Sequence, residues 1–329
     1  MTSSSLQWQH HRMRLRRAIL LTFVLLPFLF VTLASSAEPE TRYYSDRFIF
    51  RGREIDNLVL AVFTFSRGQE DDKFYGEFFG AIFVHNEWSF LEGNDKYLYK
   101  PGDLKTIQPS YFAKAEGSRT SGFKLRYDGG DFTINVASGP VQTLYASDAG
   151  KTLQRQIGAA EAVLTLRGKE YWGELIHEPV VWSGFNGLKR YKGLYKEYQA
   201  FYLITERGRE IYLHRNSASG QEFLDRYHFT ETLLPEGGFI RSAKQPAYFF
   251  KPPIPLRLLN SIHPPFAFYP VPQRWKVDAP TVGTLYAWSR KNASKNWVWG
   301  GYYLMAIEGV LKTGETEERA WGVAEYIPN

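Results

Sequence analysis

Cysteine is absent from the 329-residue sequence. Its absence excludes disulfides, thiol catalysis, thiolate zinc sites and iron–sulfur clusters. Long helical periodicity is also lacking, and only residues 152–166 and 221–234 have a pattern that fits a short helix. No Gly-x-Gly-x-x-Gly unit opens a helix, and neither a phosphate-binding loop nor a Gly-x-Ser-x-Gly elbow is present. The histidines show no His-Glu-x-x-His spacing. We therefore expect no cofactor and no metal site.

Aromatic residues are abundant instead, at 16% of the chain. Aromatic and β-branched residues favour strands. Residues 123–127 and 132–136 alternate apolar and polar side chains on either side of a turn with two glycines, which predicts a hairpin. A second hairpin is expected to join residues 200–204 to 211–214. About eight strands are expected before residue 168 and a similar number after it, so the fold class is all-β, with two antiparallel barrels in tandem.

The two predicted barrels span residues 38–168 and 169–329. Seven of the nine tryptophans follow Gly168, and nine prolines lie between residues 246 and 280. Proline cannot donate a hydrogen bond in a central strand, so residues 246–280 are predicted to form a Pro-rich loop or sheet edge, as a lid or a wrap between the barrels.

Residues 1–37 have the pattern of a secretory signal peptide. Four arginines between residues 12 and 17 precede an apolar run at 18–33, whose 16 residues are fewer than the roughly 20 needed to span a bilayer. A Ser35-x-Ala37 site follows, which predicts cleavage after Ala37, with an uncleaved anchor as the alternative. Export of a chain without cysteine fits a bacterial periplasmic or secreted protein.

Removal of the signal peptide leaves little net charge. The remaining 36 Lys and Arg residues stand against 34 Asp and Glu residues, a net charge of +2. The basic residues are scattered, so we expect no nucleic-acid partner. Contact with a membrane is expected only through the signal peptide or during transient lipid exchange, and the oligomeric state is left open.

A series of motifs in the second half of the chain resembles one known family. In order along the chain they are His177-Glu178-Pro179-Val180-Val181-Trp182, the strands Tyr198–Leu203 and Glu210–His214, Tyr269-Pro270, Trp299-Gly300-Gly301 and Trp321–Tyr326. They resemble the AttH-like lipocalin family, which includes hydroxyneurosporene synthase, the carotenoid 1,2-hydratase. The acid and the histidine occur here in reversed order, and Gly300 stands where the family has a glutamate.

The resemblance implies two lipocalin-like barrels and an aromatic-lined cavity for a small apolar ligand. Hydration of an isoprenoid double bond needs an acid in apolar surroundings, where burial raises the pKa of a carboxyl group. The implied catalytic residues are Glu178 and His177. The implied ligand contacts are Trp182, Tyr198, His214, Trp297 and Trp299.

Neighbouring residues of a strand face opposite sides of a sheet. His177 and Glu178 are therefore not expected to point inward together unless Pro179 introduces a bulge. In the structural alternative, one of the two ties down a turn and the other lies at the surface.

Three functions remain open from the sequence. The first is an exported lipocalin-like protein that binds an apolar lipid- or isoprenoid-type ligand. The second is a hydratase or isomerase that acts on an isoprenoid-like substrate by acid–base catalysis. The third is carbohydrate binding on exposed tryptophans.

Overall fold

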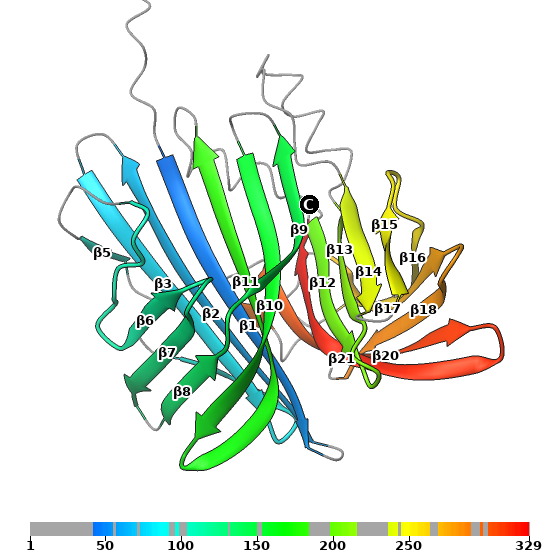
Figure 1. The fold of residues 1–329 in the computed structure, drawn as a ribbon, viewed down its shortest axis with the longest axis horizontal. Coiled ribbons are helices and arrows are strands. Elements are labelled where there is room, and N and C mark those ends of the chain that lie inside the picture. The colour runs from blue at the N-terminus through cyan, green and yellow to red at the C-terminus, as the bar shows by residue number, and fades with distance from the viewer. Residues whose placement is uncertain are drawn as a thin grey trace, which may run out of the picture. The chain divides into compact units, whose positions relative to one another are not determined.

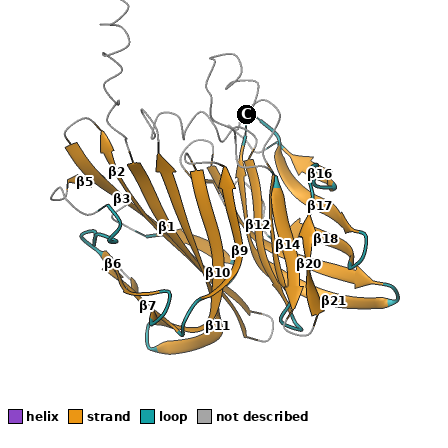
Figure 2. Ribbon diagram, turned by 45° about the horizontal axis from the view of Figure 1, so that its top comes forward, coloured by secondary structure: helices purple, strands orange, loops and turns teal. Residues whose placement is uncertain are grey.

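The computed structural model describes residues 42–328 except 55–56, 71–72, 92–95, 99–103, 131, 150–152, 184–197, 216–235, 243–244, 264–268, 291–296 and 299–301. The predicted signal peptide therefore lies outside the described residues. The described part of the chain contains strands and turns and no helix (Figure 2). Within the same ranges, no helical segment has the length and apolar character needed to cross a bilayer.

The strands form two antiparallel sheets (Figure 1). The first sheet contains β1 (Arg42–Glu54), β2 (Asn57–Glu70), β3 (Lys73–Val84), β4 (Glu87–Phe90), β5 (Lys96–Leu98), β6 (Ala113–Ser118), β7 (Gly122–Gly129), β8 (Phe132–Ser138), β9 (Gln142–Ala149), β10 (Leu153–Leu166) and β11 (Lys169–Ser183). The second contains β12 (Tyr198–Thr205), β13 (Glu210–Arg215), β14 (Gly237–Ser242), β15 (Gln245–Phe250), β16 (Leu256–Ile262), β17 (Val271–Ala279), β18 (Gly283–Ser289), β19 (Trp297–Val298), β20 (Tyr302–Thr313) and β21 (Thr316–Ile327).

Both sheets have the same strand order. The first runs β4-β3-β2-β1-β11-β10-β8-β7-β6, and the second runs β15-β14-β13-β12-β21-β20-β18-β17-β16. In each half the first strand pairs with the last, and a further strand, β9 or β19, pairs with the strand before the last. The prediction of an all-β fold built from two antiparallel units is confirmed.

Three apolar layers hold the sheets together. The first core lies on the inner side of the first sheet and includes Phe48, Phe63, Phe78, Phe123 and Leu175. The second core lies on the inner side of the second sheet and includes Phe201, Leu213, Trp275, Met305 and Ala324. The intersheet layer joins the two sheets and includes Ile49, Leu60, Ile176, Tyr202 and Val323.

Strand alternation decides which layer each side chain enters. Along β1, Phe48 and Phe50 enter the first core, whereas Ile49, between them, enters the intersheet layer. β2 is therefore apolar on both faces, with Leu58, Leu60 and Val62 in the intersheet layer and Val59, Ala61 and Phe63 in the first core. This two-sided burial is why residues 58–65 and 78–84 form nearly continuous apolar runs in the sequence.

Two expectations about organisation need correction. The segment 152–166, considered for a short helix, contains the whole of β10 and, in addition, residue 152, which lies outside the described residues; pairing with β8, β9 and β11 outweighs the helix propensity of the alanines in this segment. The boundary predicted after Gly168 falls inside the β10–β11 hairpin, where Arg167 and Gly168 have φ angles of 50° and 79°. These are turn conformations rather than a linker, and β11, after this turn, still belongs to the first sheet, whereas β12 belongs to the second.

The Pro-rich stretch 246–280 is not a single loop. It contains most of β15, all of β16 and all of β17. β15 and β16 are the two terminal strands of the second sheet, as expected for strands next to prolines. The other expected helix, 221–234, lies outside the described residues, whereas both predicted hairpins are present as β7–β8 and β12–β13.

Candidate functional site

His177 and Glu178 are neighbours on β11 and face opposite sides of the first sheet. The His177 ring contacts Phe48 and Phe123 of the first core. The Glu178 carboxylate faces the second sheet, where the Tyr202 hydroxyl donates to its Oε2 at 2.7 Å. The alternation expected from the sequence is therefore present without a bulge that turns both inward, and the two residues belong to different sites.

The His177 site is defined here as His177, Asp46, Arg67 and Arg119. His177 Nε2 lies 2.7 Å from Asp46 Oδ1, and the other oxygen of Asp46 lies 2.8 Å from Arg67 Nη1. Arg67 also donates to the main-chain carbonyls of Leu104 and Lys105, which fixes its guanidinium. Burial by itself raises the pKa of Asp46, but the hydrogen bond with His177 and the charge of Arg67 outweigh it, and the pKa is lowered. Asp46 is thus an ionised acceptor.

The His177 imidazole is neutral and oriented. The residue is only 3% exposed. Its ring stacks on that of Phe48, with the ring centroids 4.7 Å apart and an angle of 14° between the planes. Burial lowers the pKa of His177, and the charge of Arg119 lowers it further, against the opposing effect of Asp46. Because Asp46 accepts at Nε2, the proton of the neutral ring lies on Nε2. Nδ1 then carries a lone pair and has no hydrogen-bond partner among the described residues.

Glu178 is part of a charged network between the sheets. Its Oε1 lies 2.9 Å from Arg155 Nε, and its Oε2 lies 3.5 Å from Arg47 Nη1. Arg47 also pairs with Glu325 of β21 at 2.7 Å. Two arginines and Glu178 of the first sheet therefore meet Glu325 of the second sheet, and the buried charges compensate one another.

Tyrosines complete this network. Arg155 donates to the Tyr212 hydroxyl at 3.0 Å, and the Tyr302 hydroxyl donates to Glu325 at 2.7 Å. Burial raises the pKa of Tyr202 and of Tyr212 well above the usual value, so both keep their protons; Tyr202 donates to Glu178, and Tyr212 accepts from Arg155. Burial also raises the pKa of Glu325, and the charge of Arg47 offsets part of this rise. The network links strands of both sheets and has the composition of a structural connection.

A second charged group lies at the same intersheet boundary. Arg51 Nη2 is 3.0 Å from Glu174 Oε2 and 2.7 Å from Glu210 Oε1. Burial, followed by the hydrogen bond and charge of Glu210, raises the pKa of Glu174 to about 9. At neutral pH Glu174 is therefore protonated and shares its proton with the Glu210 carboxylate, and Arg51 balances the remaining negative charge.

Two further residues implied by the resemblance lie near Glu178, not near His177. The Arg155 Cζ atom is 5.8 Å from the centre of the Tyr198 ring, and the rings of His214 and Tyr212 are 5.6 Å apart. Both side chains are buried in the intersheet region. The structure thus brings Glu178, Tyr198 and His214 together and leaves His177 on the other face of β11.

The three remaining tryptophan predictions are not tested at the level of side chains. Trp182 pairs through its backbone with Tyr43 of β1, and Trp297 pairs with Tyr303 of β20. Their side chains, and Trp299 as a whole, lie outside the described residues. Of the five tryptophan side chains that are described, only Trp172 is exposed, which provides one stacking surface rather than a row.

Asp46, Arg67 and Arg119 were missed from the sequence. Each is far from His177 along the chain, and no local motif joins them. One signal was available: Asp46 alternates with Phe48 and Phe50, so its side chain enters the same core as two phenylalanines. A charged residue on the inner face of a buried strand needs a partner, and that requirement points to a site.

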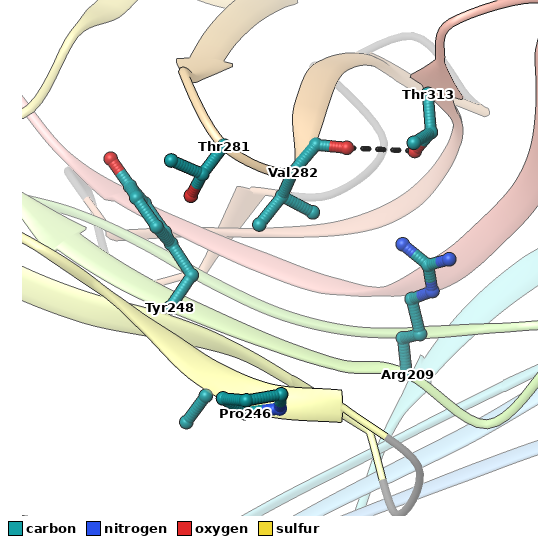
Figure 3. A pocket seen from close by; sticks show the side chains of 7 residues that line it. Arg209, Pro246, Tyr248, Thr281, Val282 and Thr313 are labelled. Carbon is teal, nitrogen blue, oxygen red and sulfur yellow. Dashed lines mark hydrogen bonds between the residues drawn. The ribbon is translucent and has the colours of Figure 1, made fainter.

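A cavity of about 390 Å³ lies at the turn end of the second sheet. Within it the Thr313 hydroxyl donates to the Val282 carbonyl at 2.8 Å (Figure 3). No predicted site residue with a described side chain lines this cavity. Among the described residues no group of His, Asp and Glu side chains has an arrangement that could hold a metal ion. The lining residues are Arg209, Pro246, Ala247, Tyr248, Thr281, Val282 and Thr313.

Comparison with known proteins shows similarity at the level of structure. No family model matches the chain, and no curated protein matches it. Kievitone hydratase from Nectria haematococca is similar with a TM-score of 0.52 at 13% identity, covering 88% of this chain and 89% of that chain. A Nitrosomonas europaea protein provisionally assigned as AttH is similar with a TM-score of 0.59 at 10% identity, covering 87% and 92%. The chain therefore has an AttH-like fold of two lipocalin-like units, a fold that it shares with a hydratase.

Proposed function

We propose that the protein is an acid–base enzyme of the hydratase or isomerase kind, acting on an apolar, isoprenoid-type ligand held at the first core. The His177–Asp46 pair carries this proposal. A buried histidine with a purely structural role is expected to have both ring nitrogens hydrogen-bonded. His177 has one nitrogen bonded to Asp46 and the other free of partners among the described residues, in aromatic surroundings.

The pair has the arrangement needed to move one proton. Nδ1 is the basic atom, and the Asp46 carboxylate stabilises the imidazolium that forms when Nδ1 takes up a proton. In an isomerisation, Nδ1 removes a proton from one ligand carbon as the double bond shifts, and returns a proton to another carbon. In a hydration, Nδ1 takes a proton from water as the oxygen bonds to one alkene carbon, and the imidazolium protonates the other carbon.

The lowered pKa of His177 suits a base that must start neutral near pH 7. Glu178 has a different part in this proposal. Its carboxylate contacts Arg47 and Arg155 of its own sheet and Tyr202 of the second sheet, so it connects the two sheets.

The second candidate is a binding protein without turnover. Phe48 and Phe123 both pack against the imidazole, which favours a ring that only shapes an apolar binding surface. Both candidates have the same ligand class, a lipid- or isoprenoid-type molecule. They differ in whether the His177 proton moves.

Deuterium incorporation separates the two candidates. The purified protein is incubated in D2O with farnesol, farnesal and β-ionone, and deuterium at carbon is followed by mass spectrometry above the protein-free rate. We expect incorporation into at least one compound by the wild type. Loss of a general base typically lowers a rate by about 100-fold or more, so His177→Gln should abolish incorporation.

Glu178→Gln distinguishes His177 from the acid implied by the sequence resemblance. It should keep the rate within about tenfold once circular dichroism shows that the variant is folded. An equal loss in both variants would assign the chemistry to Glu178 and overturn the proposal. Binding of these compounds with no incorporation by the wild type would support the binding protein instead.

Export is part of the same proposal. The basic segment, the apolar run and the Ser35-x-Ala37 site support a periplasmic or secreted product that begins at Glu38. N-terminal sequencing of the protein from its native host tests this directly. A mature chain that begins at Met1 or Thr2 would contradict it.

A further inference from the structure

Arg119 lies beside His177 because the neighbouring strand has a glycine at the contact point. His177 of β11 pairs with Gly158 of β10, and Gly158 pairs with Thr143 of β9. Cross-strand neighbours project to the same face, so the side of Gly158 that lacks a side chain is the side on which His177 lies. A Cβ atom at residue 158 would overlap Nη2 of Arg119, which shows that this guanidinium fills the space.

Arg119 reaches this space from the turn between β6 and β7. Strands in a sheet are about 5 Å apart, so the guanidinium lies roughly one strand spacing from His177. Its Nη2 donates to the Thr143 hydroxyl at 3.0 Å. Its Nη1 is buried and has no hydrogen-bond partner among the described residues.

The charges of the His177 site compensate Arg119 only in part, since Asp46 is the one carboxylate among its four residues. Asp46 already serves both Arg67 and His177, and His177 is neutral. Two arginines and one carboxylate therefore give the site a net charge of +1. A buried donor with a positive charge is stabilised when it meets an oxygen atom that is negative or becomes negative.

We propose that Arg119 binds the carbonyl oxygen of the substrate and stabilises the negative charge that this oxygen acquires when His177 removes a proton. This inference rests on the acid–base function proposed above and names its substrate class: an apolar, unsaturated carbonyl compound. The Arg119 guanidinium and His177 Nδ1 lie about one strand spacing apart, which matches the separation between the oxygen of a carbonyl group and a proton on a nearby carbon. The oxygen accepts from Arg119, and the carbon beside the carbonyl gives its proton to Nδ1.

The steps balance for both reactions. In the isomerisation, Nδ1 takes a proton from carbon, the electron pair moves to the carbonyl oxygen as an enolate, and the imidazolium returns the proton at a different carbon. In the hydration, water loses a proton to Nδ1 while its oxygen bonds to the β-carbon, and the enolate then takes the proton at the α-carbon. Nδ1 of His177 and Nη1 of Arg119 are buried, whereas Thr143 is exposed and Arg119 only partly buried, so we place the entry of the ligand on the Thr143 side of the site.

The test uses β-ionone, an isoprenoid ketone, and β-ionol, the alcohol with the same carbon skeleton. Deuterium incorporation in D2O, dissociation constants and the near-ultraviolet absorption of bound β-ionone are measured for the wild type, Arg119→Met, Arg119→Lys and His177→Gln. Arg126→Met is the matched control, because Arg126 is an exposed arginine of β7 whose side chain pairs with Asp128.

We expect the wild type to exchange deuterium into β-ionone and not into β-ionol, and to shift the absorption of bound β-ionone to longer wavelength. Removal of one donor to a developing oxyanion costs about 100- to 1,000-fold in rate. Arg119→Met should show this loss together with loss of the absorption shift. Arg119→Lys should recover part of both, and Arg126→Met should match the wild type. His177→Gln should lose exchange and keep the shift.

The two proposals fail in different ways. Exchange that His177→Gln abolishes and Arg119→Met leaves intact would overturn the role of Arg119 and keep the acid–base function. Exchange into farnesol, which has no carbonyl group, would do the same. Equal binding of β-ionone and β-ionol without a shift would likewise overturn the role of Arg119 alone. If the wild type exchanges nothing into any of these compounds, both proposals are overturned.

Discussion

The proton shared by Glu174 and Glu210 makes the stability of the protein depend on pH in a predictable direction. Glu174 has a pKa of about 9 in the folded chain, against an ordinary value of 4.5. Between these values the folded chain holds a proton that the unfolded chain has released. The free energy of unfolding therefore falls as pH rises, by up to about 1.4 kcal/mol for each pH unit.

The substitution Glu174→Gln removes this titration and retains the shape. The glutamine NH2 group can still donate to Glu210, and its oxygen can still accept from Arg51. The stability of the variant should therefore gain on the wild type as pH rises. From pH 5 to pH 8 the relative gain is at most about 4 kcal/mol. Other titrating groups, such as His177, are common to both proteins and cancel in the difference.

Urea unfolding at pH 5, 6, 7 and 8 measures this difference. Glu54→Gln is the matched control: Glu54 lies on the same strand as Arg51, but its side chain is exposed and pairs with Lys169. We expect the control to follow the wild type and the Glu174→Gln curve to separate from both at higher pH. Parallel curves for Glu174→Gln and the wild type would show that Glu174 is ionised in the folded chain, and would refute the shared proton.

Two further substitutions test the contacts between the sheets and within the first sheet. Arg47→Met removes the cation that lies between Glu178 and Glu325, and loss of one partner of a buried ion pair lowers the free energy of unfolding by about 3–5 kcal/mol. Urea unfolding at pH 7 measures this loss. The control is Lys114→Met, which breaks an exposed ion pair and should change the free energy of unfolding by less than about 1 kcal/mol. Gly173→Ala would place a Cβ against the backbone of Arg51 and Gly52, so β1 and β11 must separate at a cost of about 1–3 kcal/mol. Gly139→Ala, whose nearest neighbour is 4.0 Å away, should be nearly neutral, and equal effects of the two glycine variants would contradict the close approach.

Local patterns predicted much of the secondary structure, and their limits have physical causes. Alternation around two glycines was sufficient for the β7–β8 hairpin, because turn and strands are adjacent in the sequence. β10 was harder, because the irregularity between Ile157 and Gly158 moves the exposed positions from even to odd residue numbers and interrupts the alternation. The Arg167-Gly168 turn resembled a domain boundary, since a hairpin turn and a short linker share the same residue types.

The site was only partly predictable. Alternation placed His177 and Glu178 on opposite faces before the structure was known, because it depends only on neighbouring residues. The partners of His177 could not be found in this way. Asp46 lies 131 residues from His177, and strand pairing across the whole first half brings them together. A contact between residues so far apart in the sequence leaves no local pattern in either segment.

The repeated topology of the two sheets supports the assignment of the proposed chemistry to the first half. β11 and β21 occupy the same place in their sheets, and each has a Trp-Gly pair, Trp172-Gly173 and Trp321-Gly322, whose glycine lies against the backbone of the first strand. Aligned on these pairs, Tyr326 stands in the place of His177. Its cross-strand partner on β20 is Tyr303, in the place of Gly158.

These two tyrosines change what the second core can hold. Their rings lie 6.0 Å apart, and the Tyr326 hydroxyl is hydrogen-bonded to the Pro270 carbonyl. A tyrosine now occupies the space that Gly158 leaves for an arginine in the first sheet, and the basic nitrogen is replaced by a phenol whose hydrogen-bond partner is the main chain. The second half keeps the framework and fills it with aromatic side chains. An arginine beside a histidine is therefore not a consequence of this fold, and this pair is the feature of the first sheet on which the proposed ligand site rests.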